Sequence, residues 1–515
     1  MKEFKDNMFL AVDFGTSACK ALLADSNGKE RGFASAACKI FQPGPEMQEQ
    51  DFEEVWKSMV IAVGKALSGL DKNRVCAISF SSAMHGFMAV DAQGRPLLKM
   101  MTWADGRAKN QAKEIAEKIG ASEISRKTGC MATALYYPAR VMWLRSNRPE
   151  IFRKAQKFVS IKDAVVNRLT GKWVMDKSHA SSNGLLDIRS LKWKEDLLEA
   201  IGISPARLPR LVESDEVAGE LSIAMAKKLG LPSGIPVIAG AGDGGLANLG
   251  SGAIEPGQAA ATIGTTGAVR KIFDQPWTIG EAGLWCYYLA SNLWYAGGAI
   301  NNGGIVLRWM RDGLFSDLRD QALAKGVEPY TAIIQLANTV APGADGLIFL
   351  PYVFGERTPY WNPMAKGVFF GLAPQHNKAH FAAAALEGIT MCMAHIFELL
   401  EKSPAGVKEV RASGGFARSD KWVQLLSDMT GKPVRLPKVK ENSAMGAALL
   451  AMKATGAIKS LRGSSDLVEV GKTFEPDFKK TRFYKERLEM FKRLYKDLEK
   501  DFELWAKMQE KGKKA

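Results

Sequence analysis

The sequence predicts an α/β protein built from two related domains. Short apolar strands alternate with helical patterns along the chain, an order typical of α/β architecture. The chain has 515 residues, more than one hydrophobic core normally serves, so at least two domains are expected. Two similar turns, Gly15-Thr16-Ser17 and Gly264-Thr265-Thr266, each follow an apolar strand and precede small residues and then a basic one. Self-similarity at about half the chain length indicates two related domains.

The first half opens with the pattern of a β-hairpin. Residues 8–25 consist of an apolar strand, a glycine turn and a second strand, and Ser-Asn-Gly-Lys then marks another turn. Residues 72–97 repeat this plan, with a polar loop between two strands and a turn at Ala-Gln-Gly-Arg. Residues 107–120 follow as a helical pattern that ends at Gly120, as helices commonly do.

The second half begins after residues 250–258, a stretch rich in turn formers. We therefore expect an N-terminal domain over 1–252, a C-terminal domain over 253–460 and a helical extension over 461–515. The extension has apolar residues at helical 3-4-3-4-3 spacing, which predicts an amphipathic helix. These residues are Leu488, Phe491, Tyr495, Leu498, Phe502 and Trp505. We expect this helix to pack on the second domain; binding to a partner protein is the alternative.

Composition favours a soluble cytoplasmic protein. Hydrophobic residues make up 46% and charged residues 24% of the chain. The apolar stretch 381–400 contains Glu387 and His395, which predicts a buried helix and no membrane partner. The net charge of +15 favours anionic partners, but no block of five Lys or Arg occurs, so no nucleic acid is expected. The six cysteines form no CxxC pair, which indicates reduced thiols, and the N-terminal apolar run is too short for a signal peptide.

Asp243 stands alone in a run of small residues, with three glycines within two positions of it. Two interpretations are open from these residues. Gly-rich turns often carry Asp because its side chain hydrogen-bonds nearby backbone. Alternatively, glycine lets the backbone approach a ligand closely, and the acid accepts a proton from a ligand hydroxyl.

The two hydroxyl-rich turns offer N–H and O–H donors to phosphate oxygens, and Lys20 follows the first. Neither turn is a Walker A loop, because GxxxxGK[ST] is absent, and no protein-kinase motif occurs. Two further glycine pairs, at 303–304 and 414–415, precede helical patterns. Each suits either an anion at a helix N-terminus or a simple tight turn.

Further motifs identify the chain as similar to the FGGY carbohydrate kinase family. Residues 367–387 match the family's C-terminal signature in full, whereas the N-terminal signature at 136–147 is poorer, because Arg140 stands where Lys is usual. The resemblance covers most of the chain, from about Leu10 to Gly456. Within the family the chain looks most like the gluconokinases, with the xylulokinases next. The gluconokinase-like stretches are 81–85, 102–107, 301–312, 342–363 and 414–420.

The resemblance implies two actin-like, ribonuclease-H-like α/β domains with the active site in the cleft between them. It implies that Asp243 is the general base, that Asp13 positions Mg²⁺ and that ATP is the phosphate donor. It places the remaining site residues in three groups. These are Thr16, Ser17 and Lys20 on the first phosphate loop; Thr265, Gly304, Gly415 and Ser419 around the nucleotide, with Ser419 where some members carry Asn; and Met84, His85 and Asp105 on the sugar side.

The expected reaction is ATP-dependent phosphorylation of a sugar or sugar acid, D-gluconate at its 6-hydroxyl. Xylulose or another pentose or polyol is the alternative acceptor. A nucleotide-dependent structural protein with the actin fold and a catalytically dead sugar sensor are the non-kinase alternatives. A homodimer is also possible on this reading. An acidic acceptor requires a cation or several N–H donors, and Arg107, Lys162 and Arg357 are equal candidates.

Other interpretations are open for individual side chains. Asp105 and Arg107 could pair only with each other, and Trp103 could be a core residue or a wall of the substrate site. His85 could be a satisfied loop residue or a sugar ligand.

Overall fold

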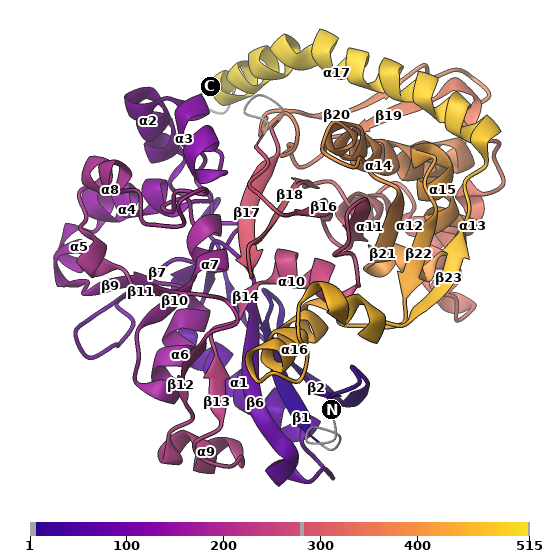
Figure 1. Cartoon of the computed structure of the whole chain (residues 1–515). Coiled ribbons are helices and arrows are strands. Elements are labelled where there is room, and N and C mark those ends of the chain that lie inside the picture. Colours follow the sequence, from indigo (N-terminus) through magenta and orange to yellow (C-terminus); the bar gives the residue numbers. More distant parts are fainter. Residues whose placement is uncertain (1–6, 279–282, 513–515) are drawn as a thin grey trace.

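The computed structural model describes residues 7–278 and 283–512 and contains two seven-stranded mixed sheets (Figure 1). The first sheet has the order β12-β13-β6-β1-β2-β3, with β14 beside β6. Its strands are β1 (Met8–Phe14), β2 (Ala18–Asp25), β3 (Glu30–Ala37), β6 (Val75–Ser82), β12 (Val217–Glu220), β13 (Pro236–Ile238) and β14 (Ala241–Gly242). The hairpin predicted at the start of the chain is confirmed, because β1 and β2 pair antiparallel.

The second sheet has the order β17-β18-β16-β15-β21-β22-β23. Its strands are β15 (Gln258–Ile263), β16 (Gly267–Phe273), β17 (Trp285–Ala290), β18 (Leu293–Ile300), β21 (Glu409–Ser413), β22 (Val434–Pro437) and β23 (Val470–Phe474). Its central part repeats the first sheet: β15 pairs antiparallel with β16 and parallel with β21, as β1 does with β2 and β6. The similarity of the two Gly-Thr turns therefore reflects a repeated topology, and the predicted two-domain α/β fold is confirmed.

Helices pack on both sheets, and short strands form small additional sheets outside them. The first half contains α1 (Phe52–Ala66), α2 (Lys109–Ile119), α3 (Ala121–Thr128), α4 (Tyr137–Asn147), α5 (Pro149–Lys154), α6 (Ile161–Thr170), α7 (Lys177–Ser182), α8 (Glu195–Ile201), α9 (Ile223–Leu229) and α10 (Asp243–Gly250). The second half contains α11 (Gly304–Asp312), α12 (Ser316–Ala324), α13 (Pro329–Ala337), α14 (Lys378–Glu401), α15 (Asp420–Thr430), α16 (Asn442–Ala454) and α17 (Phe478–Gly512). The short strands are β4 (Ile40–Phe41), β5 (Glu49–Gln50), β7 (Met88–Val90), β8 (Met100–Met101), β9 (Lys157–Val159), β10 (Val174–Asp176), β11 (Arg210–Val212), β19 (Ile348–Pro351) and β20 (Gly367–Phe370). Helix α2 ends before Gly120, as predicted.

The plan predicted for residues 72–97 is only partly right. Strands β6 and β7 form, but they do not pair with each other; β6 joins the first sheet and β7 pairs with β9. The chain turns away between them at His85, which has a φ of 67°. The buried Arg140 donates to the carbonyls of His85, Met101 and Thr102, and so holds this loop in place.

Helices α10 and α16 lie between the two sheets (Figure 1). Their backbones touch, because a Cβ on Gly250 would lie 1.9 Å from the Asn442 oxygen and one on Gly446 would lie 2.1 Å from the Leu246 oxygen. The buried side chains of α16 join one apolar cluster with Phe9 of the first sheet. The C-terminal half of the chain therefore contributes a helix to the core of the N-terminal half.

The buried apolar helix and the amphipathic C-terminal helix predicted in the second half are both present. Helix α14 is long and apolar enough to cross a membrane by length and composition alone, but 89% of its apolar window is buried inside the protein. Helix α17 packs along the second domain, as predicted, through residues such as Leu488, Phe491 and Tyr495 (Figure 1). Trp505 does not share this packing and is 51% exposed, whereas Phe502, one turn earlier, is buried.

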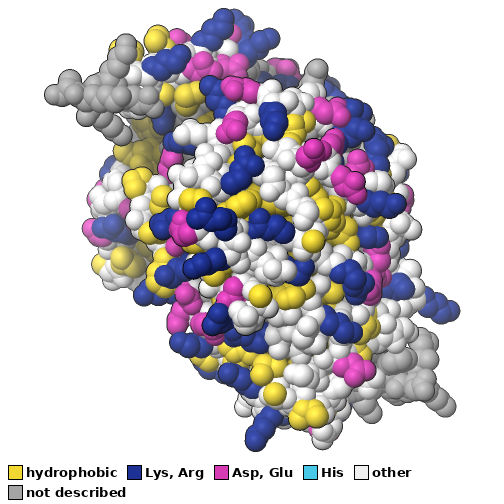
Figure 2. Space-filling model, turned by 90° about the vertical axis from the view of Figure 1, so that its left-hand side faces the viewer, with side chains coloured by type: hydrophobic (Ala, Val, Ile, Leu, Met, Phe, Trp, Pro, Cys, Tyr) yellow, Lys and Arg dark blue, Asp and Glu magenta, His cyan; other side chains and the backbone are white. Residues whose placement is uncertain are grey.

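Basic side chains are scattered among acidic and apolar ones over the face drawn in Figure 2, without gathering into one block. All six cysteines are free, and five of them are buried.

Candidate active site

One turn between β15 and β16 lines two neighbouring cavities. Gly264 and Thr265 line a larger cavity of about 420 Å³, and Thr266 and Gly267 line a smaller cavity of about 200 Å³. The turn is closed by a hydrogen bond of 2.8 Å from the Gly264 N–H to the Thr266 oxygen. Groups bound in the two cavities would therefore meet across a single backbone turn.

The N-terminus of α11 fixes this turn from the side. The Gly304 N–H donates to the Gly264 oxygen at 2.7 Å, and the Ile305 N–H donates to the Thr265 oxygen at 3.0 Å. A Cβ on Gly304 would lie 2.6 Å from the Gly264 oxygen, so this approach requires glycine.

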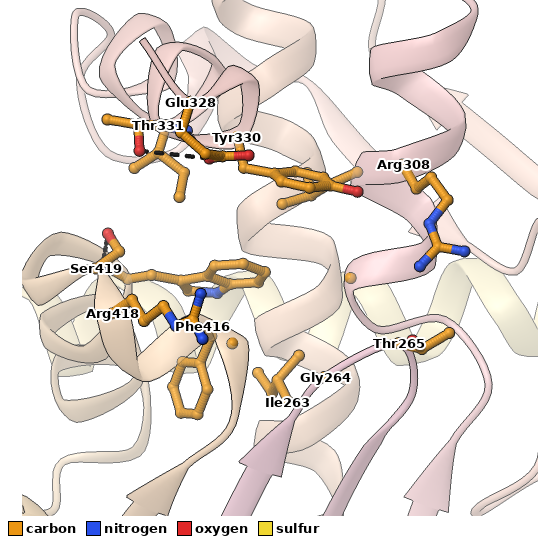
Figure 3. A pocket seen from close by; sticks show the side chains of 15 residues that line it. Ile263, Gly264, Thr265, Arg308, Glu328, Tyr330, Thr331, Phe416, Arg418 and Ser419 are labelled. Atoms are coloured by element: carbon orange, nitrogen blue, oxygen red, sulfur yellow. Dashed lines mark hydrogen bonds between the residues drawn. The ribbon is translucent and has the colours of Figure 1, made fainter. Parts of the chain in front are cut away.

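The larger cavity brings together the four residues predicted to surround a nucleotide: Thr265, Gly304, Gly415 and Ser419. Glu328, Tyr330 and Thr331 face Arg418 and Ser419 across it, with Arg308 and Thr265 at a third side (Figure 3). The Ser419 hydroxyl accepts the Trp422 N–H at 3.3 Å and so caps α15. The cavity therefore combines backbone donors at helix starts with aromatic and basic side chains, a combination suited to a nucleotide.

Asp243 lines the smaller cavity as the first residue of α10. Burial raises the pKa of its carboxyl to about 6, and the neighbouring charge of Asp13 acts in the same direction. Arg270 opposes this rise in pKa. The helix N-terminus and the nearby cation both favour the ionised carboxylate of Asp243, but desolvation outweighs them. The carboxyl can therefore take up or release a proton near neutral pH.

Asp13 and Lys20 lie directly opposite each other on β1 and β2. The Ser81 hydroxyl donates to Asp13 Oδ1 at 2.6 Å, while burial raises the pKa of Asp13. Lys20 Nζ forms an ion pair of 2.6 Å with Glu441, the residue before α16. Burial lowers the pKa of Lys20, but the hydrogen bond to Glu441 and the neighbouring negative charges outweigh it, so the pKa of Lys20 is raised.

Met84 and His85 also line the smaller cavity. His85 Nδ1 donates to the Ser182 carbonyl at 2.7 Å, because a carbonyl oxygen can only accept. Burial lowers the pKa of His85 to about 3, so the ring is neutral. Its Nε2 is then left as a hydrogen-bond acceptor. Arg140, which replaces the family's usual Lys, holds the His85 carbonyl and so supports this position.

Of three further site residues predicted in the first half, one lines the smaller cavity and two line neither cavity. Thr16 lines the smaller cavity and accepts the Trp103 indole N–H at 2.9 Å. Ser17 is exposed and lines neither cavity. Asp105 also lines neither cavity, because its carboxylate is occupied by Arg107 and by the Gln48 N–H at 2.8 Å. The structure therefore does not bring Asp105 to the sugar side.

The structure separates the three cations considered for an acidic acceptor. Arg107 is paired with Asp105 and Glu49, and Lys162 is buried and paired with Asp176. Arg357 lines the smaller cavity. Its guanidinium lies 5.3 Å from the ring centre of Trp103, which is another lining residue and so a wall of this cavity.

Sequence reasoning missed Arg270 and the aromatic side chains of Trp285, Tyr287 and Trp361, which also line the smaller cavity. For Arg270 a signal existed. Ala268 and Arg270 alternate along β16 and continue the spacing from Thr266 in the turn before it, so the turn residue and the strand alternation together indicate Arg270. The three aromatics lie in stretches that show no local pattern of a ligand site.

The chain matches the "FGGY family of carbohydrate kinases, N-terminal domain" over residues 8–250 and the C-terminal domain of that family over residues 259–455. It is 38% identical to a gluconokinase of Bacillus subtilis over 89% of this chain and 90% of that one. Among solved structures, a gluconate kinase of Lactobacillus acidophilus superposes with a TM-score of 0.90 at 31% identity, covering 96% and 98% of the chains. A xylulose kinase of the same organism superposes with a TM-score of 0.91 at 30% identity, covering 97% and 100%.

The fold is that of a two-domain carbohydrate kinase, a phosphotransferase with an alcohol acceptor. The chain belongs to the FGGY family of carbohydrate kinases.

Proposed function

We propose that this protein transfers the γ-phosphate of ATP to the 6-hydroxyl of D-gluconate. The observation that carries the proposal is the shared turn 264–267, which lines a nucleotide-sized cavity on one side and the cavity of Asp243 on the other. A phosphate bound at this turn would lie beside an acceptor hydroxyl in the smaller cavity. Relatives named gluconokinase and gluconate kinase support the acceptor.

In this proposal Asp243 takes the proton of the attacking hydroxyl as the bond to phosphorus forms. A pKa of about 6 keeps most of its carboxyl ionised at neutral pH while it remains a useful base. The neutral His85 accepts a hydrogen bond from a sugar hydroxyl through Nε2. The apolar and aromatic walls of the cavity exclude water, which would otherwise compete as the acceptor.

We further propose that Asp13 holds Mg²⁺ together with the ATP phosphates. The described residues contain no group of three or more His, Cys, Asp or Glu side chains that could hold a metal. The single carboxylate of Asp13 could still serve, because Mg²⁺ usually takes one or two carboxylates and completes its shell with phosphates and water. Bound there, the ion would offset the charge of the transferred group. Lys20, beside Asp13, would contact the same phosphates.

The charge of the smaller cavity distinguishes gluconate from xylulose as the acceptor. Arg270 and Arg357 line it against the single carboxylate of Asp243, and His85 is neutral. An excess of positive charge favours a sugar acid over a neutral ketopentose.

The test is ADP release by the purified protein with ATP and either gluconate, xylulose or no acceptor. We expect kcat/KM for gluconate to exceed that for xylulose by orders of magnitude, because a neutral sugar leaves buried donors unpaired. Faster turnover of xylulose would overturn the gluconate assignment. Absence of turnover with every sugar and sugar acid would favour the non-catalytic alternatives.

A further inference from the structure

We infer that Arg270 and Arg357 together bind the carboxylate of the acceptor and determine the preference for an acidic sugar. The inference rests on the proposed function and adds to it the residues that recognise the acid group. Arg270 comes from β16 and Arg357 from the loop after β19, yet both line the smaller cavity.

Several guanidinium atoms of this pair lack a partner. Nε and Nη1 of Arg270 and Nε of Arg357 are buried and make no hydrogen bond within the described residues. A buried charged donor is costly to leave without a hydrogen-bond partner, so an anion bound at these atoms would stabilise the site. A carboxylate, with two oxygens and about four acceptor positions, matches this set of donors.

No carboxylate of the described residues satisfies the pair instead. None of the described carboxylates forms an ion pair within 4.0 Å with either arginine, although Asp243 lines the same cavity and its charge favours the protonated form of Arg270. Glu356 is next to Arg357 in sequence, but its carboxylate accepts from the backbone N–H groups of Asn301 and Arg357, each at 2.7 Å. The acid nearest in sequence is therefore occupied by the loop itself.

The two cations lie close enough to affect each other. Burial lowers the pKa of Arg357; the charge of Glu356 opposes this fall, and the charge of Arg270 adds a smaller contribution to it. An anion between the two guanidinium groups would remove this repulsion. The site is also ordered in advance, because Arg357 Nη2 donates to the Ile300 oxygen at 3.2 Å while the guanidinium lies over Trp103. A preformed pair loses little side-chain entropy when the anion binds.

Two anions could satisfy the same donors: the carboxylate of the acceptor or the phosphoryl group in transfer. Equilibrium binding without ATP separates them. Isothermal titration calorimetry should compare gluconate with D-glucitol, which carries a neutral CH₂OH in place of the carboxylate. We expect R270Q and R357Q each to weaken gluconate binding by about 10- to 150-fold, the range expected for losing a hydrogen bond to a charged group. Binding of D-glucitol should change by less than about threefold.

The matched control is R411Q. Arg411 is also a buried arginine with unpartnered Nε and Nη1 atoms, but it pairs with Glu409 and lines neither cavity. It should leave both affinities unchanged. R270K and R357K, which keep the charge but not the planar fork, should fall between wild type and the Gln variants. Unchanged ATP binding in the other cavity and a cooperative thermal transition would show that each variant is folded.

Unchanged gluconate binding in R270Q and R357Q would overturn the inference. If kcat then fell with gluconate and xylulose alike, the anion would be the transferred phosphoryl group. An equal loss of gluconate and D-glucitol binding would also overturn it, because that pattern reports general damage to the cavity. These outcomes are independent of the proposed function, which is tested by the acceptor preference of the wild-type protein.

Discussion

Replacing Asp243 by Asn should abolish most activity and at the same time stabilise the protein. Asn keeps the shape of the side chain but cannot accept a proton, and loss of a positioned general base costs about 10²- to 10⁴-fold in rate. In wild type, the pKa of about 6 implies that the ionised fraction falls from about nine-tenths at pH 7 to about one-tenth at pH 5. The acid limb of kcat/KM should follow this fall, whereas the residual activity of D243N should lack it.

The stability effect follows from the same raised pKa. The folded pKa of about 6 lies above the ordinary value of 3.8, so the unfolded state ionises first as pH rises. Wild type therefore loses stability between about pH 4 and pH 6. A shift of about two units corresponds to about 3 kcal/mol. D243N avoids this cost, so it should be more stable than wild type by up to about 3 kcal/mol at pH 7 and by almost nothing below pH 4.

The assay pairs steady-state ADP release with chemical denaturation of wild type and D243N from pH 4 to pH 8. D243N should show both the rate loss and a stability gain that grows with pH. Near-normal turnover in D243N would refute the assignment of the base. A pH-independent difference in stability would refute the argument that desolvation raises the pKa of Asp243.

Three further variants test other parts of the structure. G304A should raise KM for ATP about tenfold or more and change KM for the acceptor less, because the added Cβ would lie 2.6 Å from the Gly264 oxygen. Initial rates at varied concentrations of ATP and acceptor will show which KM changes. K20M should lower kcat/KM for ATP by about 10- to 100-fold through loss of a charged hydrogen-bond donor, and an unchanged value would remove Lys20 from the phosphate site. Y495A should destabilise the second domain by about 3–5 kcal/mol, because Tyr495 is buried and stacks on Tyr360 at a ring distance of 3.4 Å. Denaturant titration measures this loss, and wild-type stability would show that α17 is dispensable.

Much of the fold could be predicted because its signals are local. Apolar strands, glycine turns and helical spacing predicted the first hairpin, the end of α2, the buried α14 and the tail helix α17. The path after β6 could not be predicted in this way. It depends on Arg140, which lies more than fifty residues later in the chain and bonds the carbonyls of the loop. The packing of α16 on the first sheet likewise depends on contacts between distant halves of the chain.

The candidate site shows the same division. Local sequence marked the Gly-Thr turns and glycine pairs that line the larger cavity, but only the family resemblance placed Thr265, Gly304, Gly415 and Ser419 around a nucleotide. The choice among Arg107, Lys162 and Arg357 required tertiary structure, because only the fold shows which cation is already paired. Asp105 fails to reach the smaller cavity for the same reason, since its partner is Arg107.

The most direct test of the account is a crystal structure with gluconate and a non-hydrolysable ATP analogue. We predict the 6-hydroxyl within hydrogen-bond distance of Asp243, the γ-phosphate at the turn 264–267 and the carboxylate between Arg270 and Arg357. Gluconate bound outside the smaller cavity, or in it with its 6-hydroxyl away from Asp243 and the γ-phosphate, would contradict the account.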